Sequence, residues 1–392
     1  MGQADFSRQY NISYITRYNR MRELIMSNPS ISEYSLPLKK LGDDIFEECI
    51  VIAILVLDSK LKFSILQMND PNVESYVPNS QLYIEDFSGK LPIVFSQSFN
   101  KLSLLCTGTV LGFVGCKIET NVFVCTDVIF PKPVEVPANA SIRNSTDANI
   151  KSDGRPAKST VENVLLMSNI VLNHSNFEKC KAMVDYFYKK VSSIVVFGDI
   201  YTESNREPDF SDFNNIFNEL NDFKGQIVLV PGPNDPTTKM LPQNPLHQLF
   251  FDQRLSTCLR NLSHPAQETV CGKKVVFMNN QILNDLRKYT MNIVAGPQTP
   301  IVLGDADILE QLIRIRLIAP NCPDTVGSTP FFEHDPFLID DCNYLVCGGC
   351  KEFQIKRVGK IVAVCIPDFS KSHSAVLADF SSDSFTEIVL DL

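Results

Sequence analysis

The sequence predicts a protein of two domains, a small all-β domain followed by a larger α/β domain. With 392 residues the chain has the length of two ordinary domains, and its hydrophobic content of 44% is enough for two cores. Residues 41–136 show short strand patterns bounded by turn residues, whereas strand and helix patterns alternate from residue 161 onward. Residues 137–160 between them are rich in Ser, Asn, Asp and Lys and poor in apolar residues, which predicts a flexible linker.

Residues 1–40 form an N-terminal segment with a predicted helix over residues 6–26. Apolar side chains recur there near helical spacing, at Phe6, Tyr10, Tyr14, Tyr18, Met21 and Ile25. Four arginines fall largely on the other faces: Arg8, Arg17, Arg20 and Arg22. We expect this helix to dock on its own domain. The alternative is a basic amphipathic helix that contacts DNA or an acidic partner.

The 41–136 segment carries six short predicted strands, which favour a small barrel with an OB-fold as the natural candidate. They are Cys49–Leu57, Lys62–Gln67, Gln81–Glu85, Leu91–Phe95, Gly108–Cys116 and Asn121–Asp127. OB-folds often bind single-stranded nucleic acid through a basic groove and stacked aromatic rings. This segment has twelve Asp and Glu against six Lys and Arg, and the chain has no Trp, so a phosphate backbone meets net repulsion. We expect a protein-interaction module; a single-stranded DNA-binding module is the alternative.

The 161–392 segment predicts a layered α/β domain with two sheets packed face to face. Its predicted strands are Asn163–Met167, Ser193–Phe197, Gln226–Val230, Lys274–Met278, Tyr344–Cys347, Lys360–Pro367, Ala375–Asp379 and Glu387–Leu390. Its predicted helices are Phe177–Val191, Phe210–Phe223 and Asp305–Ile318.

Two of these strands end in Gly with an Asp beside it, in the sequences IVVFGD (194–199) and IVLVPGPNDP (227–236). Ligands and metals gather at such strand ends in open α/β sheets. The pattern resembles the calcineurin-like metallophosphoesterases, whose two cations lie about 3.5–4 Å apart and are held by carboxylates and imidazoles. The resemblance implies a phosphoesterase-type α/β sandwich.

Most of that two-metal site is missing from the sequence. Asp199 fits the family's GD position and Asp235 remains at the next strand end, but Pro233 stands where the family has a metal-binding Asn. Asn234 stands where the family has a catalytic His, and an amide cannot transfer a proton near neutral pH. The chain has five histidines, and none is spaced as H-x-H. We therefore predict no metal, no cofactor and no catalysis, with Asp199 and Asp235 capping helices or turns.

Three further groups of residues are candidate sites. Cys342, Cys347 and Cys350 have metal-like spacing but lack a second pair, so we expect core or loop cysteines. Arg314 and Arg316 could contact phosphate, although nearby acids (Asp305, Asp307 and Glu310) favour ion pairs. The stretch Thr329–Phe332 with Phe337 is either an exposed apolar interface or part of the core.

The whole chain resembles the small, non-catalytic B-subunits of the replicative DNA polymerases alpha, delta and epsilon, and most closely those of delta. The stretches that carry this resemblance are Ile227–Phe250, Gln311–Phe337, Tyr344–Gly349 with Val364–Ser370, and Cys49–Ile54 with Gly108–Phe113. The resemblance implies an OB-fold and an inactive phosphoesterase domain. It also implies an accessory scaffold in DNA replication and repair, located in the nucleus. Such a protein would hold the C-terminal cysteine-rich module of the catalytic subunit and bridge it to a third subunit that engages the sliding clamp. The protein would contact DNA only as part of the assembled holoenzyme.

Three alternatives stay open at this point. One is an active phosphodiesterase or 3′→5′ exonuclease with a metal site rebuilt from Asp199, Asn234, Asp235 and His247. A second is that the chain is the B-subunit of polymerase alpha or epsilon. A third is that it is also a subunit of a translesion polymerase of the same class. The composition favours an intracellular protein with twelve reduced cysteines, and no apolar run approaches the roughly 20 residues of a membrane span.

Overall fold

A computed structural model describes residues 11–59, 80–96, 99, 106–134, 163–172, 174–201, 210–220, 223–253, 255–289, 303–331 and 333–390. The chain divides into two compact units, and each contains two separate stretches of sequence. Unit 1 comprises Met1–Val134 and Ile282–Asp340, and unit 2 comprises Glu135–Gln281 and Asp341–Leu392. The predicted linker over 137–160 and the predicted strand Lys62–Gln67 lie outside the described residues.

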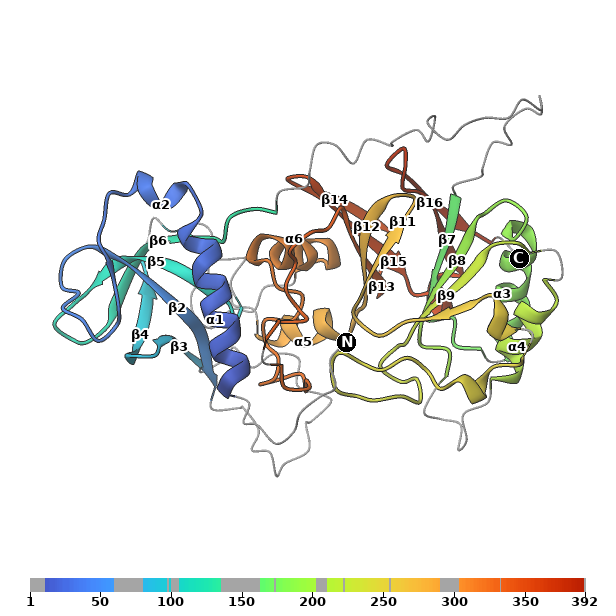
Figure 1. The fold of residues 1–392 in the computed structure, drawn as a ribbon, viewed down its shortest axis with the longest axis horizontal. Helices are drawn as coiled ribbons and strands as arrows, with labels where there is room; N and C mark the ends of the chain where they lie inside the picture. Colours follow the sequence, from blue (N-terminus) through green and yellow to red (C-terminus); the bar gives the residue numbers. More distant parts are fainter. Residues whose placement is uncertain are drawn as a thin grey trace, which may run out of the picture. The chain divides into compact units, whose positions relative to one another are not determined.

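Unit 1 contains one six-stranded sheet (Figure 1). Its strands are β1 (Leu38–Lys39), β2 (Cys49–Ser59), β3 (Ser80–Asp86), β4 (Gly89–Phe95), β5 (Val110–Lys117) and β6 (Phe123–Ile129). The strand order is β1-β2-β3-β4-β6-β5, and β5 also pairs with β2, so the hydrogen-bonded order returns to β2. Alternate residues point inward, and Val51, Leu55, Phe113 and Phe123 fill a common core. The five predicted strands that the structure describes are confirmed to within two residues at each end.

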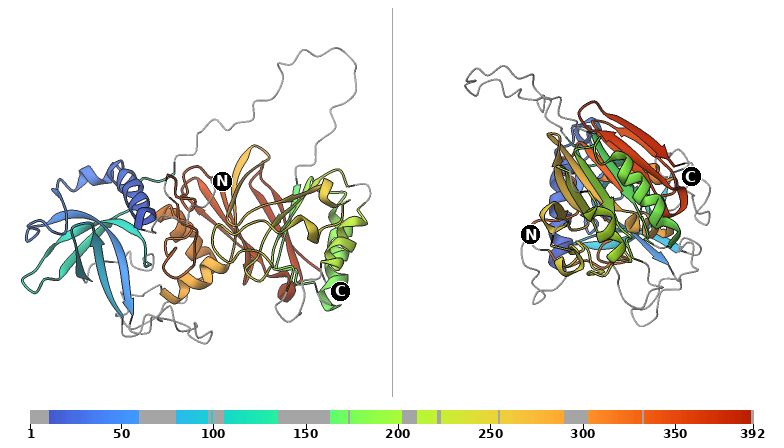
Figure 2. Two further views of the ribbon diagram at one scale, coloured as in Figure 1. Left: turned by 60° about the horizontal axis from the view of Figure 1, so that its bottom comes forward. Right: turned by 90° about the vertical axis from the view of Figure 1, so that its right-hand side faces the viewer.

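The N-terminal helix α1 (Asn11–Met26) packs against β2 and β5, and the short helix α2 (Ser30–Glu33) follows it (Figure 2). Met21 and Ile25 are fully buried, and Tyr18 donates a hydrogen bond to the Ile52 carbonyl at 2.8 Å. The prediction of a docked helix is therefore confirmed for residues 11–26. The arginine at its centre, Arg17, is only 4% exposed, so it cannot contact DNA.

The segment 282–340 contains helix α5 (Gln281–Tyr289) from its second residue onward and helix α6 (Asp305–Ile315), and its described residues after α6 are irregular up to Asp340. The structure groups these residues with the N-terminal part of the chain, whereas the sequence-based boundaries place them in the second domain. Buried polar contacts explain the difference. Arg17 donates to the Pro320 and Cys322 carbonyls at 3.0 and 2.7 Å, and Arg316 donates to the Lys132 carbonyl at 3.0 Å.

Unit 2 contains two sheets with different strand orders. The first runs β10-β9-β8-β7-β16-β17 and consists of β7 (Asn163–Ser168), β8 (Ser193–Phe197), β9 (Gln226–Val230), β10 (Leu259–Asn261), β16 (Ser374–Asp379) and β17 (Ser384–Val389). The second runs β11-β12-β13-β15-β14 and consists of β11 (Ala266–Val270), β12 (Lys273–Asn279), β13 (Tyr344–Cys350), β14 (Gln354–Val358) and β15 (Ile361–Pro367). Strands β7 to β10 are mutually parallel, as are β12, β13 and β15.

The two sheets of unit 2 share one apolar core, and helices cover the other face of the first sheet. Val164 and Leu166 of β7 face the core shared with Phe277 and Val346 of the second sheet. Leu165 and Met167 belong to the other apolar core, which they share with residues of α3 (His174–Phe187) and α4 (Ser211–Asn218). These two helices lie on one side of the first sheet (Figure 1). Because β7 is buried on both faces, its sequence is apolar at every position of the run 164–167.

Short helical turns complete the unit: η2 (Gln248–Phe250), η3 (Leu255–Thr257) and α7 (Phe369–Ser372). The predicted mixed α/β architecture is thus present with several sheets. No helix of the described residues has the length and apolar character that crossing a bilayer requires.

Candidate functional site

A polar cluster lies at the carboxyl ends of parallel strands β7, β8 and β9, with contributions from β13 and from the segment after β15. The strand register aligns Ser168 of β7 with Phe197 of β8 and Phe197 with Val230 of β9. The residues that follow these strands therefore emerge at one edge of the sheet, where α/β proteins place ligands. Asp199 follows β8 and Asp235 follows β9, so the structure brings these two predicted site residues together.

The carboxylate of Asp199 is held by Asn234. Oδ1 accepts the Asn234 backbone N–H at 2.8 Å, and Oδ2 accepts its side-chain amide at 2.7 Å. The Asp199 backbone N–H donates to Oδ1 of Asn169 at 3.0 Å, which links it to the segment after β7. Asp199 is only 5% exposed. Asn234 thus acts as a donor that fixes the neighbouring acid.

Asp235 is fully buried and bonds three backbone groups. Its Oδ1 accepts from Ile200 N at 2.8 Å and Tyr201 N at 3.2 Å, and its Oδ2 accepts from Gly232 N at 2.8 Å. A carboxylate offers about four lone-pair positions. Backbone N–H groups of the two neighbouring loops therefore occupy most of the acceptor positions of Asp235. The side chain ties the loop after β8 to the loop after β9.

Burial sets the electrostatics of this pair. Burial together with the nearby Asp199 charge raises the pKa of Asp235 to about 7, against the lowering effect of its three backbone hydrogen bonds. Burial also raises the pKa of Asp199, although the two hydrogen bonds from Asn234 and the charge of Lys239 oppose this. Both acids therefore gain protons more readily than an exposed aspartate does.

The close approach of the two loops requires glycine at two positions. A Cβ on Gly198 would collide with the Asp235 carboxylate and the Gly232 backbone, and a Cβ on Gly232 would collide with Asp199. The GD and GPND sequences are explained by this packing alone. Pro233 has no side-chain ligand atom, and its carbonyl accepts a hydrogen bond from the Lys239 ammonium group.

The neighbouring strand ends add polar groups with protein partners. Ser168 donates to the Pro367 carbonyl at 2.6 Å and accepts from Gly349 N at 2.9 Å. Asn169 donates to Asp368 at 3.4 Å. Asp368 caps α7, where its Oδ1 accepts from the backbone and hydroxyl of Ser370, and it pairs with Lys371 at 2.9 Å.

His247 is the fourth residue of the metal site that the sequence leaves open as an alternative, and it is not part of this hydrogen-bond network. It is exposed and caps η2, where its Nδ1 accepts from Leu249 N at 3.3 Å. No hydrogen bond joins it to Asp199, Asn234 or Asp235 in the part of the chain that the structure describes. Within the same residues, no group of three or more His, Cys, Asp or Glu side chains is arranged to hold a metal ion.

Sequence reasoning missed a buried pair, Gln243 and His264, which lies behind the cluster. Their backbones pair at 2.6 and 3.0 Å, and Gln243 Nε2 donates to the Gly232 carbonyl at 2.8 Å. His264 is fully buried with no partner for either ring nitrogen among the described residues, and burial lowers its pKa to about 3. No local sequence pattern identifies Gln243 and His264, because their pairing with each other and the bond from Gln243 to Gly232 form only when the loop after β9 folds back.

The three clustered cysteines lie in the core, as predicted. Cys342, Cys347 and Cys350 are each at most 1% exposed. Their thiols donate to nearby backbone carbonyls, with Cys342 bonding Tyr344 at 2.8 Å. Burial raises the pKa of the Cys342 thiol to about 12.

The remaining candidates have structural partners. Arg314 pairs with Glu310 at 2.6 Å, as predicted, whereas Arg316 ends α6 and bonds the Ile339 carbonyl at 3.0 Å and Asp340 at 3.1 Å. Phe331 is 9% exposed and Phe337 is fully buried, so these two rings belong to the core of unit 1. Phe332 lies outside the described residues.

Comparison with known proteins identifies the family. The family of DNA polymerase alpha/epsilon B-subunits matches residues 157–354. The DNA polymerase delta subunit OB-fold domain matches residues 9–128. A protein of Arabidopsis thaliana named DNA polymerase delta small subunit is 25% identical over 405 residues, covering 94% of this chain and 88% of that protein. Its namesake in Oryza sativa is 24% identical and covers 96% of this chain and 91% of that protein.

Among solved structures, a conserved uncharacterized protein of Streptococcus pneumoniae, described as a predicted phosphoesterase, is similar at 11% identity with a TM-score of 0.27. It covers 58% of this chain and 88% of that chain. The family match spans just over half of the sequence, and the curated relatives match it over nearly its full length. The chain belongs to the family of DNA polymerase alpha/epsilon B-subunits.

Proposed function

We propose that this chain is the non-catalytic small subunit of a DNA polymerase delta holoenzyme. The curated relatives that match nearly the whole chain are named DNA polymerase delta small subunits. The OB-fold match to delta subunits supports the same branch of the family and favours delta over alpha or epsilon.

The observation that carries the non-catalytic proposal is the bonding of the two strand-end acids. Asp235 accepts three backbone N–H groups and Asp199 accepts two groups of Asn234. A two-metal phosphoesterase needs such carboxylates free to bridge cations. Here their hydrogen bonds hold two loops together, which supports a structural role for a phosphoesterase-type domain that has lost its metal ligands.

A domain whose strand-end loops are held together by hydrogen bonds suits a scaffold. In the role we propose, the protein binds the C-terminal cysteine-rich module of the catalytic subunit and joins it to a third subunit, which reaches the sliding clamp. It meets DNA through the assembled holoenzyme and acts in the nucleus. The OB-fold domain, with twelve acidic and six basic residues over 41–136, then contacts proteins and not a phosphate backbone.

Co-purification tests the proposal. The full chain is expressed with the C-terminal cysteine-rich segment of the delta catalytic subunit from its own organism, and the mixture is analysed by size-exclusion chromatography with light scattering. We expect one peak with the mass of a 1:1 complex. The corresponding segments of the alpha and epsilon catalytic subunits serve as matched controls and should elute separately.

Two separate peaks, with the delta segment shown to be folded and metal-loaded, would overturn the assignment to delta. A complex with the alpha or epsilon segment alone would move the chain to that branch of the family.

A further inference from the structure

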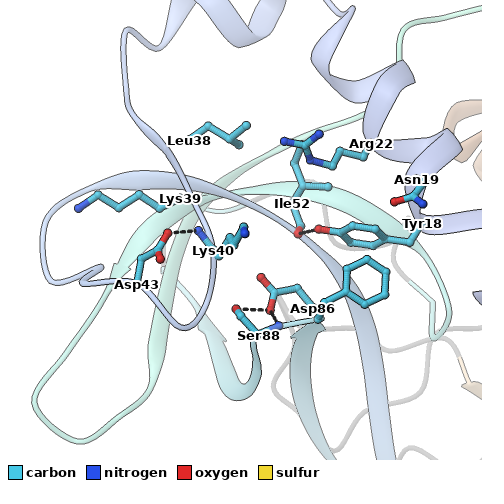
Figure 3. A pocket seen from close by; sticks show the side chains of 11 residues that line it. Tyr18, Asn19, Arg22, Leu38, Lys39, Lys40, Asp43, Ile52, Asp86 and Ser88 are labelled. Carbon is cyan, nitrogen blue, oxygen red and sulfur yellow. Dashed lines mark hydrogen bonds between the residues drawn. The ribbon is translucent and has the colours of Figure 1, made fainter. Parts of the chain in front are cut away.

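A surface hollow of about 500 Å³ lies in unit 1, where α1 meets β1, β2 and the turn between β3 and β4 (Figure 3). Helix α1 contributes Tyr18 and Arg22, the β1 region contributes Leu38 and Lys40, and the turn contributes Phe87. None of these residues belongs to the strand-end cluster of unit 2.

Two exposed apolar side chains, Phe87 and Leu38, line the hollow beside Tyr18. The Phe87 ring is 66% exposed and packs edge-on against Tyr18, with ring centroids 4.7 Å apart at an angle of 73°. Tyr18 is held in turn by its hydrogen bond to the Ile52 carbonyl. Leu38 adds a second apolar side chain that is 39% exposed. A large exposed aromatic ring on a fixed support is the kind of anchor that binding surfaces use.

The two carboxylates that line the hollow, those of Asp43 and Asp86, accept hydrogen bonds from backbone N–H groups. Asp86 caps its own turn, because its carboxylate accepts from Ser88 N at 2.7 Å and from Gly89 N at 3.0 Å, and it also accepts from Leu41 N at 2.9 Å. Asp43 accepts from Lys40 N at 2.8 Å. Neither carboxylate pairs with a cation of the hollow among the residues that the structure describes.

Two cations of the hollow face solvent. Arg22 and Lys40 are exposed, and neither side chain makes a hydrogen bond or ion pair with the residues that the structure describes. Lys39, by contrast, donates to the Asp44 carbonyl at 2.5 Å and points away from the other two (Figure 3). The lining carries three cations (Arg22, Lys39 and Lys40) against two carboxylates (Asp43 and Asp86), so its net charge is +1. Arg22 and Lys40 present their charges beside an exposed aromatic ring.

A polynucleotide matches these features less well than a peptide does. Residues 41–136 carry twice as many acids as bases, which repels a polyanion along its length, whereas two cations suffice for one or two carboxylates. Strand β1 also stands at the end of the strand order, so an extended segment can run beside it.

We propose that this hollow binds an extended segment of a partner protein in which acidic residues adjoin an aromatic or branched apolar side chain. The apolar side chain packs on Phe87 and Leu38, and the carboxylates pair with Arg22 and Lys40.

Selection from a random 12-residue phage-displayed library tests the proposal, with the full chain as bait. We expect the selected peptides to combine Asp or Glu with Phe, Tyr, Trp or Leu. A fluorescent synthetic peptide of the consensus sequence is then titrated by anisotropy. We expect Arg22→Glu/Lys40→Glu to weaken its binding tenfold or more, by roughly 1.4 kcal/mol per factor of ten. Phe87→Ala should weaken binding while leaving its salt dependence unchanged.

The matched control is Lys224→Glu/Lys360→Glu, which makes the same charge change at exposed positions of unit 2. It should bind the peptide as the wild type does. Thermal unfolding of each variant reports whether the fold is retained.

Selected peptides without acidic residues, or equal binding by the Arg22/Lys40 variant and the control, would overturn the proposal. A labelled dT12 oligonucleotide provides the other arm. If it binds at physiological salt and loses affinity in the Arg22/Lys40 variant while the peptide does not, the occupant is nucleic acid and the peptide proposal is wrong.

Discussion

Arg17 and Asp335 lie 318 residues apart in the chain and form a buried ion pair, with Arg17 Nε 2.6 Å from Asp335 Oδ2. Their side chains are 5% and 2% exposed. The guanidinium also bonds two carbonyl groups and lies over the Phe331 and Phe337 rings, at 5.4 and 5.8 Å from their centroids. This pair connects the N-terminal helix to the 282–340 segment. It helps to explain why these two separate stretches of the chain form one unit.

Replacing Arg17 should destabilise the protein strongly. Arg17→Met leaves the Asp335 carboxylate buried without its cation, which typically costs about 3–5 kcal/mol. Urea denaturation of the variant measures the loss in the free energy of unfolding. The control is Arg20→Ala, because the partners of Arg20, Glu23 and Asp340, are more than one third exposed and such pairs contribute about 1 kcal/mol or less. Equal losses for the two variants would contradict the role given to Arg17.

Asp235 should make the protein less stable as the pH rises from about 4 to about 7. An unfolded aspartate loses its proton near pH 3.9, whereas the folded protein holds the Asp235 proton up to about pH 7. Between these values the unfolded state binds fewer protons, so stability falls with increasing pH. Asp235→Asn removes this titration, and we expect a shallower pH dependence of the unfolding free energy between about pH 4 and 8. An unchanged slope would show that the folded protein has already ionised Asp235 in the acidic part of this range.

Arg316 tests whether side-chain bonding outweighs backbone strain. Its φ of 58° lies in the left-handed region, where glycine is favoured by about 1 kcal/mol. Arg316→Gly relieves that strain but deletes the bonds to Ile339, Lys132 and Asp340, each worth about 1.5–3 kcal/mol for a charged donor. We expect net destabilisation by about 2 kcal/mol or more in thermal or urea unfolding.

The matched control for Arg316 is Asn121→Gly, at an exposed turn with the same φ of 58°. It should be neutral or slightly stabilising, because only backbone strain is relieved. A stabilising Arg316→Gly would mean that the buried bonds of Arg316 contribute little.

The cysteines should divide into protected and reactive sets. Burial raises the pKa of Cys106, Cys180, Cys322 and Cys342 to about 12, so these thiols lack both access and thiolate character. Brief alkylation with iodoacetamide at about pH 8, followed by peptide mass spectrometry, should label the half-buried Cys116, Cys258 and Cys271 before the four buried thiols. Labelling of Cys342 as fast as Cys116 in the folded protein would contradict the buried placement.

The local elements follow closely from the sequence. The predicted strands Ser193–Phe197 and Gln226–Val230 match the observed strands residue for residue, because short β-branched runs between polar turns fit no other element well. The convergence of Asp199 and Asp235 is also foreseeable, since both follow parallel strands. Helix α5, by contrast, is not predicted, because its nine residues give a short and weak periodic signal.

The long-range contacts cannot be read in this way. Nothing near Arg17 indicates that its partner is Asp335, so a central arginine on a helix is as compatible with DNA as with the core. The role of Asn234 is equally hidden, because its bond to Asp199 depends on how two loops meet. Such pairings are set by the tertiary fold and leave no trace in local spacing.

The most direct test of the non-catalytic role is a phosphodiesterase assay on the purified full chain with Mn²⁺, using bis-p-nitrophenyl phosphate and a 3′-labelled oligonucleotide as substrates. Asp199→Ala and Asp235→Asn serve as matched variants. We expect no metal-dependent hydrolysis above the level of either variant, because both acids are bonded to protein groups. Hydrolysis that requires Mn²⁺ and disappears in Asp199→Ala would contradict the scaffold assignment and restore a working metal site at these strand ends.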